Sequence, residues 1–133
     1  MRKISNPSVR LKPQTSQAPI KRGFPWVYHN EIVLDRRTRA IEAGQIVQVQ
    51  SSSRIPIAIA AFNANSKITL RILDLLPNQK IDLYWISLRI KAAVDLRERM
   101  FDAPFYRLIH AEADGLPGVI IDRFGDICVI QPN

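Results

Sequence analysis

Three titratable side chains alternate along one short segment of the chain. His110, Glu112 and Asp114 are each separated by one residue, so on an extended strand they would share one face. A histidine with two carboxylates can bind a metal ion or carry out acid–base chemistry. The alternative is a turn before Gly115 in which the carboxylates accept hydrogen bonds from nearby backbone N–H groups. We favour the turn, because paired catalytic carboxylates must flank a substrate across a cleft.

Neither the cysteine nor the glycines indicate a catalytic centre. Cys128 is the only cysteine and lies in the apolar run ICVIQ, so we expect a buried, unreactive thiol. No intramolecular disulfide can form, which fits a reducing compartment such as the cytoplasm. The five glycines form neither a GxGxxG motif nor a P-loop. We therefore expect no catalytic residue, no metal and no cofactor site in this chain.

The positive charge is concentrated at one end of the sequence. Residues 1–40 hold nine Lys and Arg against two Asp and Glu, whereas residues 41–133 hold ten of each. Aromatic Phe24, Trp26 and Tyr28 lie among these bases, and a basic segment with interleaved aromatics is typical of proteins that bind nucleic-acid phosphates. The alternative is a solvated arm that aids solubility. The candidate RNA-binding residues are Lys12, Lys21, Arg22, Arg36, Arg37, Arg39, Lys67 and Arg71.

The first part of the chain has the pattern of a small β-barrel or sandwich. We predict strands over residues 8–11, 31–34, 46–50, 55–62 and 68–75, and a short helical turn beginning at Pro25. Val47 and Val49 should face the core. Trp26 could be a stacking platform or a core residue, and we favour the core. The longest apolar stretch is far shorter than the ~20 residues of a membrane-spanning helix, so we expect no membrane partner.

The second part changes period. Asp82 is a plausible N-cap for an amphipathic helix whose apolar arc includes Leu83, Ala93 and Met100. Arg97 falls inside that arc, and we expect its guanidinium to reach water or a carboxylate. Strands are predicted over residues 106–111, 119–123 and 127–131. The last could be an open edge that pairs with another chain, so self-association is a further expectation. We place the boundary between the two parts near Pro77.

Three segments resemble a known family. GFPWVYHNEI, FNANSKITLRIL and YRLIHAEADGLPGVIIDRFGD are similar to the N-terminal half of the ribosomal RNA large-subunit methyltransferase I family, which methylates RNA cytosine with S-adenosylmethionine. The resemblance implies an α+β chain, with a PUA-type RNA-binding β-barrel over residues 1–77. It also implies the start of a central α/β domain, truncated, over residues 78–133. The implied partner is RNA, specifically ribosomal RNA, and the implied cofactor of the full-length family is S-adenosylmethionine.

The family's catalytic parts have no counterpart in this sequence. Its cofactor-binding glycine motif, Asp-Pro-Pro segment and catalytic cysteine belong to a third domain, and Cys128 does not match that cysteine. We therefore expect a fragment, cut or encoded short, that binds RNA and positions substrate for rRNA processing without methyl transfer of its own. Two alternatives remain open: a free-standing RNA-binding adapter, and a protein-interaction module whose basic segment is incidental.

Overall fold

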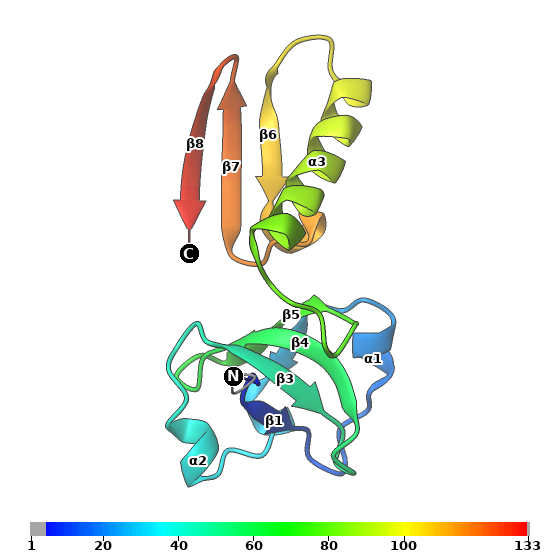
Figure 1. Ribbon diagram of the computed structural model, residues 1–133, viewed down its shortest axis with the longest axis vertical. Helices are drawn as coiled ribbons and strands as arrows, with labels where there is room; N and C mark the ends of the chain where they lie inside the picture. Colours follow the sequence, from blue (N-terminus) through cyan, green and yellow to red (C-terminus); the bar gives the residue numbers. More distant parts are fainter. Residues whose placement is uncertain (1–4, 133) are drawn as a thin grey trace. The chain divides into compact units, whose positions relative to one another are not determined.

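The computed structural model describes residues 5–132 and divides into two compact units, Met1–Gln79 and Lys80–Asn133. Arg2 and Lys3, counted above among the bases, lie outside the described residues. Both units combine helix and sheet (Figure 1), so the predicted α+β class is confirmed.

A five-stranded sheet forms the first unit, in the order β1-β3-β4-β5-β2. The β1–β3 pair is parallel, and every other pair in this sheet is antiparallel. The predicted strands at 46–50, 55–62 and 68–75 are confirmed to within a residue at each end. The bounds are β1 (Ser8–Arg10), β2 (Trp26–Tyr28), β3 (Ile46–Gln50), β4 (Pro56–Phe62) and β5 (Ile68–Asp74).

The sheet curls until its two edges meet (Figure 1). Beyond β1, Leu11 forms an antiparallel bridge with Ile32, which follows β2. Two backbone hydrogen bonds flank that bridge, from the Lys12 N–H to the Glu31 carbonyl and from the Val33 N–H to the Arg10 carbonyl, each 2.9 Å. These bonds satisfy backbone groups that an open sheet would leave unpaired, and they produce a barrel. Its short helices are α1 (Ala18–Lys21), the 3-10 turn η1 (His29–Glu31) and α2 (Arg36–Arg39).

One hydrophobic core fills the barrel. Val47 and Val49 are fully buried, as predicted from the alternation in β3, and Phe62 is the largest side chain among the fully buried ones. The β-branched and aliphatic residues that surround them come from all five strands and from both ends of the closing bridge. A close-packed apolar interior of this kind makes the barrel a rigid framework for the residues on its surface.

Two local predictions for the first unit are wrong. The segment after Pro25 is strand β2 rather than a helical turn, and the predicted strand over residues 31–34 is reduced to the single bridge at Ile32. Pairing explains the first error: β2 aligns with β5, and the Pro25 carbonyl accepts a hydrogen bond from the Ile72 N–H. Contacts with a distant strand therefore outweigh the local preference of proline for a helix start.

The second unit is a three-stranded antiparallel sheet, β6-β7-β8, with helix α3 packed against β6 (Figure 1). The predicted N-cap is confirmed, because the Asp82 carboxylate accepts a 2.9 Å hydrogen bond from the Trp85 N–H. Among the described residues, no helix is both long and apolar enough to cross a bilayer. The bounds are α3 (Leu83–Met100), β6 (Phe105–His110), η2 (Ala111–Asp114), β7 (Val119–Phe124) and β8 (Ile127–Pro132).

Two burial predictions for the second unit are wrong in part. Leu83 and Met100 of the predicted apolar arc are exposed, and Trp85 packs inside with Ala93 instead. Cys128 is exposed, not buried, because every residue of β8 is solvent-accessible at the edge of the sheet. The apolar run at residues 127–130 therefore indicates a strand correctly, but it does not indicate that the strand is buried.

Candidate nucleic-acid interface

The two units differ in charge. Residues 1–79 contain twelve Lys and Arg against four Asp and Glu, whereas residues 80–133 contain seven against eight. The whole positive excess of the chain thus belongs to the barrel unit. An interface that attracts phosphates should be sought on this unit, because counterion release on phosphate neutralisation dominates nucleic-acid affinity.

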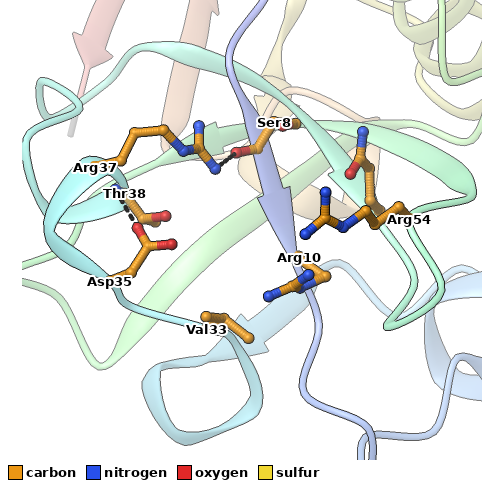
Figure 2. Close-up of a pocket in the computed structure, with 8 residues that line it drawn as sticks. Ser8, Arg10, Val33, Asp35, Arg37, Thr38 and Arg54 are labelled. Atoms are coloured by element: carbon orange, nitrogen blue, oxygen red, sulfur yellow. Dashed lines mark hydrogen bonds between the residues drawn. The ribbon is translucent and has the colours of Figure 1, made fainter.

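Three arginines surround a hollow of about 260 Å³ on the barrel unit. Arg10 comes from β1, Arg37 from α2 and Arg54 from the turn between β3 and β4. Figure 2 shows these side chains around β1, with the Arg37 guanidinium donating to the Ser8 carbonyl at 3.0 Å. Among the described residues, Arg10 and Arg54 have no hydrogen-bond partner for their guanidinium groups. Their donors are available to a ligand.

Helix α2 is positioned by its N-cap. The Asp35 carboxylate accepts a 2.8 Å hydrogen bond from the Thr38 N–H (Figure 2), and Thr38 is the buried residue of the helix. The same hydrogen bond, helped by the positive charges of Arg37 and Arg10, lowers the pKa of Asp35 below its ordinary value. The carboxylate is thus ionised at neutral pH and anchors a helix of only four residues.

Arg54 is presented by a tight turn. The buried Ser51 holds this turn, because its carbonyl accepts from the Arg54 N–H and its N–H donates to the Ile55 carbonyl, both at 2.9 Å. The Ser51 hydroxyl also accepts a 3.1 Å hydrogen bond from the Ile55 N–H. Arg54 adopts a φ of +64°, the left-handed region that favours glycine. Arginine therefore occupies a position whose backbone conformation would suit glycine better.

A second hollow of about 430 Å³ adjoins the first and shares Val33 and Asp35 with it. Lys12 and Arg39 line it, together with His29 of η1. Arg39 is oriented by a 3.0 Å hydrogen bond from its Nε to the Leu34 carbonyl. We call the two hollows together the basic groove. Its five basic residues are Arg10, Lys12, Arg37, Arg39 and Arg54.

The structure brings together three of the eight predicted RNA-binding residues. Lys12, Arg37 and Arg39 line the basic groove, whereas the other predicted bases do not line it. Those others are exposed Lys21, Arg22, Arg36 and Lys67, and half-buried Arg71 on β5. Sequence reasoning missed Arg10 as a site residue and missed Arg54 entirely. Arg54 lies outside the basic first third, and the pairing of β3 with β1, which sets Gln50 opposite Arg10, brings the following turn beside β1.

The acidic segment of the second unit has a structural role. Asp114 ends η2, and its carboxylate accepts from the Arg97 guanidinium and from the His110 N–H, both at 2.7 Å. The turn interpretation is therefore confirmed for Asp114, and the expected carboxylate partner of Arg97 is identified. Within residues 5–132 no three His, Cys, Asp or Glu side chains are grouped as metal ligands.

The geometry of the basic groove suits phosphate oxygens. Guanidinium groups donate several hydrogen bonds in one plane, which matches a phosphate better than the point charge of an ammonium does. Val33 and Leu34 give the floor an apolar component beside these donors. An extended polyanion with apolar faces could therefore lie along the groove.

Comparison with known sequences identifies relatives of this chain and a family model that matches the barrel unit. A family model described as a PUA-like domain matches residues 9–75. The chain is 29% identical over 136 residues to a ribosomal RNA large subunit methyltransferase of Deinococcus radiodurans, covering 96% of this chain and 33% of that protein. It is 34% identical over 113 residues to ribosomal RNA large subunit methyltransferase I of Erwinia tasmaniensis, covering 83% and 28%. The chain thus spans about a third of the length of these relatives.

Solved structures agree on the fold. A Streptococcus mutans protein described as a SAM-dependent methyltransferase superposes with a TM-score of 0.72 at 19% identity, covering 96% of this chain and 33% of its own. A methyltransferase solved in complex with SAH gives a TM-score of 0.70 at 19% identity, with 98% and 33% coverage. The fold of this chain is therefore shared with larger proteins.

Proposed function

The chain belongs to the PUA-like domain family, and from this premise we propose that its barrel unit binds RNA along the basic groove. The observation that carries the proposal is the pair Arg10 and Arg54, whose guanidinium groups border one hollow and have no partner within the described residues. Three arginines that line one hollow repel one another, and a bound phosphate would relieve that repulsion. Asp35 also lines this hollow, but its single negative charge offsets only one of the three arginine charges.

RNA affinity should therefore depend on these two arginines. We expect Arg10→Ala with Arg54→Ala to weaken binding of a single-stranded RNA and to reduce the slope of log affinity against log salt by about 1.4, or ~0.7 for each lost phosphate contact. Fluorescence anisotropy at several salt concentrations measures both quantities. Lys91→Ala with Arg99→Ala removes the same charge from the exposed face of α3 and serves as the control. Equal loss in both double variants, or an unchanged slope, would support the protein-interaction alternative.

The biological setting follows from the relatives. We infer that the RNA is ribosomal and that the chain positions it for an S-adenosylmethionine-dependent methyltransferase, since the matching proteins bear those descriptions. For this role we propose a cytoplasmic location, because ribosomal RNA is processed there in bacteria. In this proposal residues 1–77 are the RNA-binding domain, and residues 78–133 form part of a central α/β domain. The chain itself contributes no cofactor-binding glycine motif to the reaction.

We also propose that β8 pairs with β8 of a second copy. It is the edge strand of its sheet, all its residues are exposed, and it contains no charged residue. Natural edge strands commonly carry lysine or another charge that opposes pairing. Because an antiparallel pair of identical edges has two-fold symmetry, a closed dimer is the simplest product.

A further inference from the structure

A second kind of site lies next to the basic groove. A hollow of about 250 Å³ is lined by Phe24, Trp26 and Tyr28, together with Thr15 and Glu31. Its aromatic residues alternate along the chain, and Trp26 and Tyr28 belong to β2, so their side chains share the outer face of that strand. Phe24 packs edge-on against Trp26, with ring centroids 6.2 Å apart. We call this hollow the aromatic pocket.

The aromatic residues are not hidden in the core. Phe24 is 44% exposed and Tyr28 is 39% exposed, whereas Val27 between Trp26 and Tyr28 is buried. The indole Nε1 of Trp26 is buried without a hydrogen-bond partner among the described residues. Neighbouring exposed rings form a contiguous apolar surface, and surfaces of this kind can mark ligand-binding grooves. Flat ligands suit such a surface, because nucleobases stack on aromatic side chains.

The single acidic side chain of the aromatic pocket restricts the ligand further. One carboxylate oxygen of Glu31 accepts a 3.0 Å hydrogen bond from the Tyr28 N–H, which fixes the side chain against the start of η1. The second oxygen has no hydrogen-bond partner within the described residues. A carboxylate repels phosphate, so this pocket suits an uncharged base rather than the backbone.

Guanine fits a carboxylate best among the four bases. Its N1–H and its N2 amino group are adjacent donors on one edge, whereas uracil presents one N–H between two acceptors. Adenine and cytosine each present one amino donor beside a ring nitrogen that accepts and would face the carboxylate. The carboxylate of Glu31 therefore favours guanine by hydrogen bonding and disfavours the others by unpaired or repelled groups.

The aromatic pocket and the basic groove are joined by one turn. His29 and Asn30 of η1 line the groove, and Glu31 of the same turn lines the pocket. The Glu31 carbonyl also accepts a hydrogen bond from the N–H of Lys12, which lines the groove, so the turn is tied to the groove wall. An RNA backbone bound in the groove would thus have a neighbouring pocket for one unstacked base. We propose that the aromatic pocket binds a single unpaired guanine of the RNA, an inference that rests on the proposed RNA-binding function.

The test compares U10 RNA with three variants in which the central base is G, A or C. We expect the single guanine to raise affinity by about five-fold or more over the other three oligonucleotides, since good bidentate base contacts discriminate by at least that factor. Glu31→Gln should abolish this preference while retaining affinity for U10, because the glutamine oxygen can still accept the Tyr28 N–H. Phe24→Ala should weaken all four complexes by removal of a stacking surface, whereas Phe124→Ala, an exposed aromatic of the second unit, should not.

The outcomes separate this inference from the proposed function. Salt-dependent binding with equal affinity for all four oligonucleotides overturns the guanine pocket and leaves the basic groove intact. A guanine preference that survives in Glu31→Gln also overturns it, because the base would then be read elsewhere. Absence of binding to every oligonucleotide overturns both proposals. Circular dichroism of each variant establishes that the fold is retained.

Discussion

Replacement of Arg54 by glycine should stabilise the barrel unit and weaken RNA binding at the same time. Arg54 has a φ of +64°, and a residue with a Cβ pays about 1–2 kcal/mol in that region. Glycine removes this strain but gives the unfolded chain more conformational freedom, which costs about 0.5–1 kcal/mol. The difference between the central values of these two ranges is a net stabilisation of about 0.7 kcal/mol.

The turn itself should survive the substitution. Its hydrogen bonds run through the backbone and the Ser51 hydroxyl, and the Arg54 side chain takes no part in them. For a unit of this size, a stabilisation of that order raises Tm by about 3–6 °C. Removal of one phosphate contact should lower the salt slope of RNA binding by about 0.7. Thermal unfolding and fluorescence anisotropy on the same preparation measure both effects.

Arg54→Ala is the matched control, because alanine removes the same guanidinium but retains the unfavourable φ. Both variants should bind RNA equally weakly, and only the glycine variant should gain stability. A glycine variant no more stable than the alanine variant would refute the strain argument. Wild-type affinity in either variant would refute the role of Arg54 in the groove.

Three further predictions concern other parts of the chain. The pKa of Asp35 is lowered in the folded state, so the ionised carboxylate contributes to the free energy of unfolding. That contribution is present above pH 3.8, the ordinary pKa of the group, and is lost as pH falls through the folded pKa. Asp35→Asn, which can still cap α2, should therefore flatten the loss of barrel stability that acid titration by circular dichroism shows below about pH 4. Asp114→Ala should destabilise the second unit by about 3 kcal/mol in urea unfolding, because it leaves the mostly buried Arg97 without its carboxylate, whereas exposed Asp126→Ala should have little effect. Val129→Lys should convert a β8-paired dimer to a monomer in light scattering, and a wild-type monomer at high concentration would contradict the pairing proposal.

Regular elements could be predicted from local pattern, because burial on one face leaves a period in the sequence. The alternation of Val47 and Val49 identified β3, and Asp82 identified the start of α3. Strand β2 could not be identified in this way, since its three residues become a strand only by pairing with β5. The four-residue helix α2 was missed, although Asp35 followed by basic residues contains an N-cap signal.

The candidate site was harder to predict than the fold. Charge counting pointed to the barrel unit, but it weighted every base of the first third alike and could not distinguish Arg37 in the groove from Lys21 and Arg22 outside it. Proximity across the barrel decides which bases act together, and proximity depends on strand order. Arg54 illustrates this, because β3 must pair with β1 before its following turn can approach Arg10.

Opposite charges in neighbouring hollows explain how one small unit could both attract RNA and discriminate among its bases. In the proposed function, Arg10, Arg37 and Arg54 would interact with any phosphate and so provide affinity without reading sequence. The carboxylate of Glu31 would repel a phosphate group and would favour a base that donates hydrogen bonds to it. Because η1 contributes to both sites, the backbone contact and the base contact are set at a fixed spacing by the same rigid turn. The barrel would therefore select RNA in which an unpaired guanine lies beside the strand that occupies the groove.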